Sequence, residues 1–217
     1  YADDRRTEVM EAVADLKIED LIAEEDMAIT VSNTGHVKRT AITEYRNQRR
    51  GGKGRIGMRT RDEDFLRQLF VASTHAYILI FSDRGRVYWL KVHEIPDVGP
   101  AGRGKAIANL VKMEQGECIA TLQAVRKWPA DDGERFVVMG TRRGVVKKTD
   151  LRAFRRPRAG GIVGTRVGDG DAVVGAELTD GQGEIFLGTR GGMAIRFTET
   201  DVRPRLRAAH GVRGISL

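Results

Sequence analysis

The sequence is poor in the features that mark small secreted proteins and membrane proteins. It has one cysteine, Cys118, which excludes an internal disulfide bond and fits a reducing cytosol. No apolar run approaches the roughly 18 residues of a membrane span, and the N-terminus lacks the basic-then-apolar pattern of a signal peptide. We therefore expect a cytoplasmic protein that does not span a membrane. The sequence begins at Tyr1 rather than Met, so we also expect it to be a piece of a longer chain.

Aromatic residues are scarce and positive charge is abundant. At 6% of the chain, aromatic side chains are too few for a surface that stacks single-stranded bases. The net charge is +7. Residues 1–27 hold ten acidic and three basic side chains, a net charge of −7, which leaves +14 on the other 190 residues. We predict an acidic lead-in helix or linker over 1–27, followed by a domain that binds a polyanion, either nucleic acid or an acidic membrane surface.

Four similar segments follow residue 27. In each, a run of apolar or β-branched residues precedes a short polar turn that ends in glycine, and a second run follows. Such runs favour strands, and glycine supplies the positive φ of a tight hairpin turn. The segments are AITVSNTGHVKRT (28–40), YILIFSDRGRVYWL (77–90), FVVMGTRRGVVKKT (136–149) and EIFLGTRGGMAIRF (184–197). The turn glycines Gly35, Gly85, Gly144 and Gly192 recur at intervals of 50, 59 and 48 residues.

Further strands are expected between the hairpins. A glycine-containing strand start follows each turn glycine by 17 to 19 residues, at Gly54, Gly104, Gly161 and Gly211. Short apolar stretches precede the second, third and fourth hairpins. Three to four strands per repeat, at a period near 50 and without a convincing amphipathic helix, predict an all-β propeller or pinwheel of four-stranded blades. A β-sandwich is the alternative, but it does not require this self-similarity.

The repeat divides residues 28–217 into four predicted blades. Their expected boundaries are 28–64, 65–113, 114–167 and 168–217. Terminal repeats normally differ from internal ones, and the fourth does not, so we expect the intact domain to have more than four blades.

Basic residues recur at equivalent places in these repeats. Some follow the turn glycines, and more lie in the link after each hairpin. Equivalent places in successive blades lie around a disc, so the cations would form a continuous basic rim. The residues expected to bind DNA are Lys38, Arg39, Arg46, Gln48, Arg49, Arg50, Gly51, Gly52, Lys53, Gly54, Arg55, Arg103, Lys105, Lys147, Lys148, Arg155, Arg156, Arg158, Arg205, Arg207 and Arg213.

A basic rim of this kind suits a phosphate backbone better than a compact ligand. Arginine binds phosphate through a two-pronged fork, and backbone N–H groups in glycine-rich turns add donors. The sequence shows no base-reading helix. We therefore predict that double-stranded DNA binds without sequence specificity and bends around the rim.

The heptad Gln48-Arg49-Arg50-Gly51-Gly52-Lys53-Gly54 matches the box that marks the A-type chain of bacterial DNA gyrase. The flanking segments EDLIAEEDMAITVS, VASTH and SDRGRVYWLKVHEIP also resemble the C-terminal domain of that family, and the resemblance covers the whole chain. The related chain of topoisomerase IV has similar blades but only a degenerate box, which makes it the alternative relative.

The resemblance implies a six-bladed β-pinwheel in which neighbouring blades exchange a strand. It implies a domain that wraps DNA around its rim, with the box required, and so supports ATP-dependent negative supercoiling. The implied partners are double-stranded DNA, the gyrase B chain and a second gyrase A chain, in an A2B2 enzyme near the nucleoid. The implied ATP and Mg²⁺ bind elsewhere in that enzyme, and no cofactor or metal is expected in this chain.

Catalysis within the chain is not expected. The tyrosines Tyr1, Tyr45, Tyr77 and Tyr88 do not match the context of the family's DNA-cleaving tyrosine, and the four histidines lack metal-ligand spacing. Asp62, Glu63 and Asp64 resemble a divalent-ion cluster, but a solvated turn is the favoured interpretation. A protein-binding propeller scaffold remains an alternative function.

Overall fold

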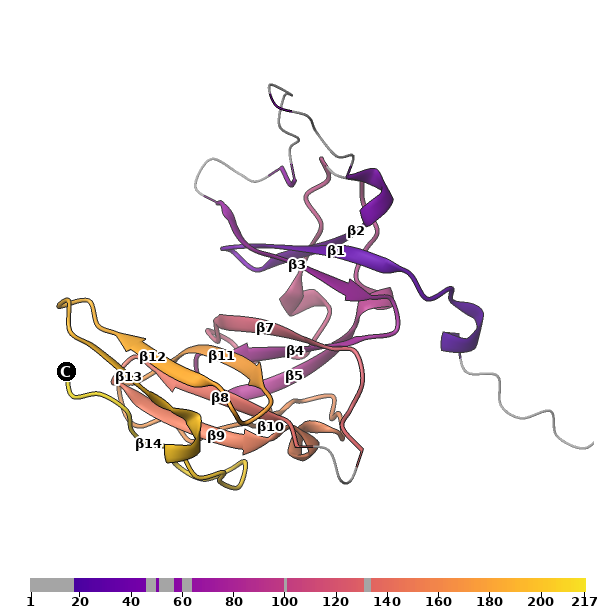
Figure 1. Ribbon diagram of the computed structural model, residues 1–217. Coiled ribbons are helices and arrows are strands. Elements are labelled where there is room, and N and C mark those ends of the chain that lie inside the picture. The colour runs from indigo at the N-terminus through magenta and orange to yellow at the C-terminus, as the bar shows by residue number, and fades with distance from the viewer. Residues whose placement is uncertain (1–17, 46–49, 51–56, 60–63, 100, 131–133) are drawn as a thin grey trace, which may run out of the picture.

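The computed structural model describes residues 18–45, 50, 57–59, 64–99, 101–130 and 134–217. In these ranges the chain forms fourteen β-strands and six short 3-10 helices, with no α-helix (Figure 1). The prediction of an all-β fold is confirmed. Each helix in these ranges is too short to span a lipid bilayer.

The four predicted hairpins all form. They are β1 (Asp26–Ser32) with β2 (His36–Ala41), β4 (Tyr77–Ser82) with β5 (Arg86–Lys91), β8 (Phe136–Thr141) with β9 (Val145–Asp150), and β12 (Glu184–Gly188) with β13 (Ala194–Thr198). The predicted turn glycines have positive φ angles, from 75° at Gly144 to 84° at Gly192. The turns therefore form where only glycine adopts the backbone easily.

A third strand pairs with the first strand of the hairpin before it. These strands are β3 (Leu66–Ser73) on β1, β7 (Ile119–Val125) on β4 and β11 (Val173–Thr179) on β8. The predicted blade boundaries after residues 64, 113 and 167 place each of these strands with the hairpin that follows it, and the structure corrects all three. The chain reverses next to the first hairpin's turn, where Asn33 N donates to the Phe65 carbonyl at 2.8 Å, so the strand runs back along β1.

A fourth strand comes from the following hairpin's link. The short strands β6 (Lys105–Ala106), β10 (Ile162–Val163) and β14 (Val212–Arg213) pair with β2, β5 and β9 respectively. The resulting sheets, which we call the first, second and third blades, have the orders β3-β1-β2-β6, β10-β5-β4-β7 and β11-β8-β9-β14. Strands β12 and β13 form the fourth blade, a two-stranded sheet in the described part of the chain. The expected strand exchange between neighbouring blades is present.

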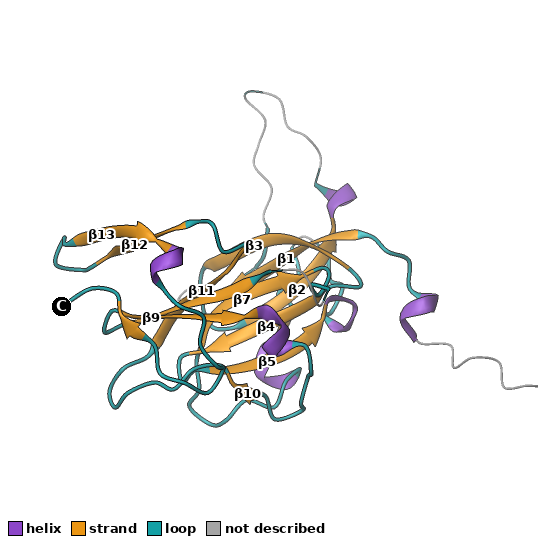
Figure 2. Ribbon diagram, turned by 60° about the horizontal axis from the view of Figure 1, so that its bottom comes forward, coloured by secondary structure: helices purple, strands orange, loops and turns teal. Residues whose placement is uncertain are grey.

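Short 3-10 helices lie in the segments that connect or precede the strands (Figure 2). They are η1 (Ile18–Leu21), η2 (Ile42–Glu44), η3 (Val92–Glu94), η4 (Ile107–Asn109), η5 (Leu151–Phe154) and η6 (Glu199–Asp201). A helix follows each hairpin, and after the second, third and fourth hairpins the chain then crosses to the preceding blade. We call these crossings the second (95–104), third (155–161) and fourth (202–211) connectors. Residues 45–56 take the corresponding place in the first repeat of the sequence, and we call them the first connector.

The core lies between successive blades rather than inside one sheet. One cluster joins Ile29 of the first blade to Ile78 and Leu122 of the second. Another joins Leu79 of the second blade to Val137 and to further residues of the third. Because apolar burial drives folding, the two clusters stabilise neighbouring blades against one another.

Candidate nucleic-acid interface

The second, third and fourth connectors each lie against the second hairpin strand of the preceding blade, which is β2, β5 and β9 respectively. In the second connector, the Pro96 carbonyl accepts a hydrogen bond of 3.1 Å from Arg39 N. In the fourth, Arg205 N donates to the Lys148 carbonyl at 2.8 Å. In the third, the Arg86 guanidinium donates to the carbonyl of Gly160. The connectors therefore occupy equivalent places on successive blades.

Many of the predicted cations on these connectors and the exchanged strands after them reach the surface. Those that are exposed are Lys105, Arg155, Arg156, Arg158, Arg205 and Arg213, and those that are half-buried are Arg103 and Arg207. Arg39, on β2 beside the second connector, is half-buried as well. Arg203, in the fourth connector, is exposed as well. Exposed cations thus occur on the third and fourth connectors and on the exchanged strands β6 and β14, as a basic rim requires.

The heptad belongs to the first connector. Arg50 is described and exposed. Gln48, Arg49, Gly51, Gly52, Lys53, Gly54, Arg46 and Arg55 lie outside the described residues. The repeat aligns this heptad with the second, third and fourth connectors, and exposed cations lie on the third and fourth.

Three predicted DNA-binding lysines are not on the surface. Lys38, Lys147 and Lys148 are 0%, 2% and 4% exposed. Their ammonium groups donate to backbone carbonyls: Lys38 to Gly99 at 3.0 Å, Lys147 to Gly164 at 2.9 Å and to Arg207, and Lys148 to Glu199 at 2.7 Å. A buried charge needs such partners, so the expectation that these three lysines face DNA is wrong.

Burial affects the protonation of two of these lysines. It lowers the pKa of the Lys38 amine, against the opposing effect of the nearby Glu44 carboxylate. Burial, together with the positive charges of Arg207 and Arg205, lowers the pKa of Lys147 to about 8. In the second blade, Tyr88 takes the same place in the repeat and is buried too. Its hydroxyl donates to Glu117 at 2.5 Å, and burial and this carboxylate raise its pKa to about 12.

The acidic residue Asp64 has a structural role. Its carboxylate accepts hydrogen bonds from Thr34 N at 2.9 Å, Thr34 Oγ1 at 2.6 Å and Phe65 N at 3.0 Å. Burial acts to raise its pKa, but these bonds and one from Ser32 hold it at about 2. No group of three or more potential metal ligands is found among the described residues, and Asp62 and Glu63 lie outside them.

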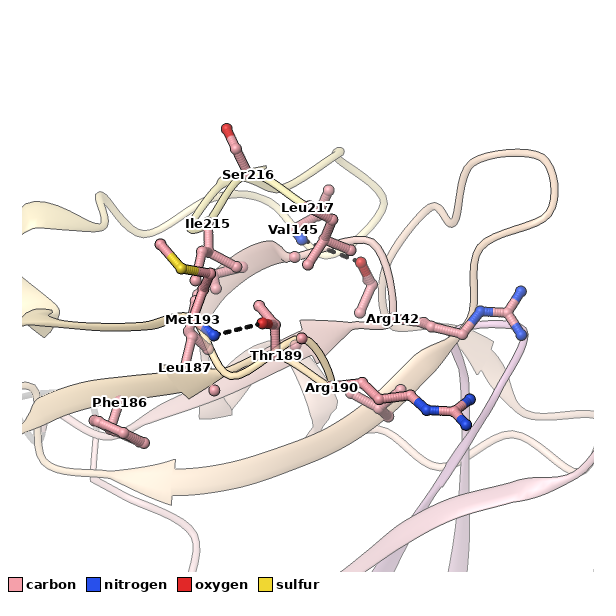
Figure 3. Close-up of a pocket in the computed structure, with 17 residues that line it drawn as sticks. Arg142, Val145, Phe186, Leu187, Thr189, Arg190, Met193, Ile215, Ser216 and Leu217 are labelled. Carbon is pink, nitrogen blue, oxygen red and sulfur yellow. Dashed lines mark hydrogen bonds between the residues drawn. The ribbon is translucent and has the colours of Figure 1, made fainter.

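A pocket of about 710 Å³ lies between the third and fourth blades (Figure 3). Its apolar lining includes Phe186, Leu187 and Met193, and Arg142 and Arg190 lie at one side. The described residues that line it include no Asp, Glu, His or Cys. Its lining therefore supplies apolar contacts and guanidinium groups rather than acid–base chemistry. The sequence does not reveal this pocket, because it forms between residues far apart in the chain.

Comparison with known proteins agrees with this architecture. The family described as "DNA gyrase C-terminal domain, beta-propeller" matches residues 26–73, 76–125, 135–180 and 183–217. The first three matched segments each contain one hairpin and the strand that follows it, as the sheets do. The DNA gyrase A chain of Salmonella typhimurium is 45% identical over all 217 residues, and the present chain spans 24% of its length.

Solved structures share the fold. The C-terminal domain of a DNA topoisomerase IV superposes with a TM-score of 0.74 at 31% identity, covering 90% of this chain and 58% of that one. A DNA gyrase A C-terminal domain superposes with a TM-score of 0.71 at 24% identity, covering 88% of this chain and 61% of that one. The repeated hairpins, the strand exchange and the four matched segments together show that the chain belongs to the family of DNA gyrase C-terminal β-propeller domains.

Proposed function

We propose that this domain binds double-stranded DNA without sequence specificity and wraps it along the connectors. The observation that carries the proposal is that exposed cations lie on or next to successive connectors, with Lys105 just after the second, Arg155, Arg156 and Arg158 on the third, and Arg205 on the fourth. Guanidinium groups spaced around successive blades suit a continuous phosphate backbone. Such contacts position DNA but carry no sequence information.

The proposed wrapping serves a larger enzyme. The relatives are gyrase A chains, and the present chain spans about a quarter of their length. In this proposal the domain supports ATP-dependent negative supercoiling by a type II topoisomerase in the cytoplasm. Its partners are the gyrase B chain and a second gyrase A chain in an A2B2 assembly. The ATP and Mg²⁺ bind to other parts of that assembly, and this domain contributes no catalytic residue.

A topoisomerase IV-type role is the second candidate. It is favoured by the similarity to the solved C-terminal domain of DNA topoisomerase IV. The two candidates differ in the first connector, where the intact heptad at residues 48–54 favours gyrase. A protein-binding scaffold would not require exposed arginines at repeated positions.

The proposal is tested by the linking number of DNA closed in the presence of the domain. Nicked plasmid is sealed by ligase with and without the protein, the protein is removed, and the topoisomers are separated on a gel. We expect a positive shift. The triple variant Arg155→Ala, Arg156→Ala, Arg158→Ala should reduce it.

A matched control removes the same charge elsewhere. Arg142, Arg143 and Arg190 are exposed but lie at hairpin turns rather than on connectors. Changing these three to alanine should leave most of the shift. Equal losses in the two triple variants would mean that net charge, not the connector path, holds the DNA. Binding without any shift would contradict chiral wrapping by this domain.

A further inference from the structure

Lys147 lies at the meeting point of two connectors. It belongs to β9 of the third blade and is 2% exposed. Its ammonium donates to the carbonyl of Gly164, just after the third connector and β10, at 2.9 Å. The same ammonium donates to the carbonyl of Arg207, in the fourth connector. One buried cation thus joins backbone segments that come from two different repeats.

The neighbouring strand residue holds the same connector. The carbonyl of Lys148 accepts a hydrogen bond of 2.8 Å from Arg205 N. The backbone at Arg205 and Arg207 is therefore fixed by consecutive residues of β9, one through its carbonyl and one through its side chain. This arrangement sets where the two arginine side chains leave the surface of the blade.

The charges around Lys147 have one sign. Arg207 and Arg205 are the charged groups that act on its ammonium, and both disfavour its protonated form, as burial does. The segment on the other side contributes the Gly164 carbonyl. Phosphate bound to the two arginines would offset their charge, and the protonated form of Lys147 would then become more favourable.

We propose that Lys147 is a positioning residue for the fourth connector, and that DNA binding to Arg205 and Arg207 is coupled to proton uptake by Lys147. This inference rests on the proposed DNA-binding function. The lysine does not touch the DNA. It holds the backbone that presents the two arginines, and its own protonation responds to whether phosphate occupies them.

Lys38 provides a matched control from the same place in the repeat. It is 0% exposed and its ammonium also donates to a connector carbonyl, that of Gly99, at 3.0 Å. The charge that acts on it is the Glu44 carboxylate, which favours its protonated form, rather than an arginine. A buried lysine bonded to a connector is thus common to both sites, whereas the influence of two connector arginines distinguishes Lys147.

The test is calorimetric titration of the domain with a linear duplex at pH about 8, in buffers with different enthalpies of ionisation. The dependence of the binding enthalpy on the buffer gives the number of protons taken up. We expect a net uptake of up to about half a proton, because a group at its pKa is half deprotonated before binding. His210, the histidine of the fourth connector, is kept in every variant, so any proton that it exchanges is common to all of them.

Two variants distinguish a positioning role of Lys147 from a general effect on the stability of the domain. Lys147→Met should abolish the proton uptake and weaken binding, whereas Lys38→Met should retain the uptake. Should Lys147→Met fail to fold, the double change Arg205→Gln, Arg207→Gln gives the same information, because it should abolish the uptake while the other connectors still bind DNA.

Each outcome has one meaning. If the unmodified domain does not bind duplex DNA, the proposed function is wrong. If it binds, and the uptake is absent or unchanged in the Lys147 and arginine variants, the coupling is wrong although DNA binding stands.

Discussion

The indole nitrogen of Trp89 donates a hydrogen bond of 2.8 Å to the carbonyl of Phe154. Trp89 belongs to the second blade, and Phe154 ends the 3-10 helix of the next repeat. In the third blade, Lys148 takes the place of Trp89 and donates to the carbonyl of Glu199, in the 3-10 helix of the fourth repeat, at 2.7 Å. Two unlike side chains thus make the same link between successive blades.

Replacing Trp89 with phenylalanine should destabilise the domain by about 1 to 2 kcal/mol, because the buried Phe154 carbonyl loses its donor. Urea unfolding followed by circular dichroism measures this change. Trp128→Phe is the control, since it keeps a ring beside Tyr77 and leaves the Phe154 carbonyl paired. Equal stability of Trp89→Phe and the unmodified domain would show that this link contributes little.

Gly104→Ala should be far more damaging than Gly192→Ala. Both glycines have positive φ, 79° and 84°, which costs about 1 kcal/mol or slightly more for alanine. A Cβ at Gly104 would lie 2.3 Å from the Val37 carbonyl oxygen, whereas one at Gly192 meets no atom within 4 Å. The difference between the two melting temperatures therefore isolates the close approach of the second connector to the first blade. Similar melting temperatures would contradict this contact.

Asp64→Asn should remove stability at neutral pH and flatten the acid limb of the stability curve. The folded-state pKa of Asp64 is about 2, below the ordinary value of 3.8 for this side chain. The unfolded chain therefore binds more protons between these values, and stability falls as pH drops through about 4 to 2. Chemical unfolding from about pH 7 down to about pH 2.5 checks this across that window. A variant with an unchanged acid limb would show that other carboxylates control it.

The unmodified domain should gain stability relative to Lys147→Met as pH rises from about 8 towards 10. The pKa of Lys147 is about 8 in the folded protein, against an ordinary value of 10.5 for a lysine amine. Between these values the Lys147 amine is protonated in the unfolded chain and largely neutral in the folded one. The free energy of unfolding therefore rises with pH in this window. Unfolding of both proteins at matched pH values measures the difference. A difference that stays constant with pH would contradict the lowered pKa.

The triple change of Arg155, Arg156 and Arg158 to alanine should lower the salt dependence of DNA binding. Each phosphate contact contributes about 0.9 to the slope of log K against log salt, so three contacts should lower its magnitude by about 2 to 3. Fluorescence anisotropy with a labelled duplex at several salt concentrations gives the slope. The Arg142, Arg143, Arg190 triple variant should keep nearly the full slope. A loss of the same size in this control would mean that the salt dependence follows the net charge of the domain rather than contacts at the third connector.

The four hairpins could be predicted from short stretches of sequence. The turn at Gly35 depends on a positive φ that glycine supplies, and the strands around it depend on a short apolar pattern, so both can be recognised within a dozen residues. The strand Leu66–Ser73 was also predicted, but the blade to which it belongs was not. Its partner is chosen by the reversal beside Asn33 and Phe65, a contact that the residue pattern does not specify.

The buried lysines mark the limit of sequence reasoning at the site. Lys38 and Lys147 lie in short strands whose polar residues are typical of a surface strand. The connector that covers each lysine comes from the following repeat. Their burial therefore depends on strand exchange rather than on nearby residues. Arg155, Arg156 and Arg158 of the third connector are exposed, as a basic rim requires, and their binding to DNA stays a prediction.

The exchanged strands also determine the order in which the sheets can be completed while the chain is being synthesised. Strand β2 ends at Ala41, but β6, which completes its sheet, begins at Lys105, after the whole second hairpin. While the chain emerges from the ribosome, each sheet must therefore wait with an open edge until the next hairpin and its connector have been made. Folding is expected to advance in steps from the N-terminus, and a stalled or shortened chain would leave its last complete hairpin with an unpaired edge, the kind of edge that promotes association between nascent chains.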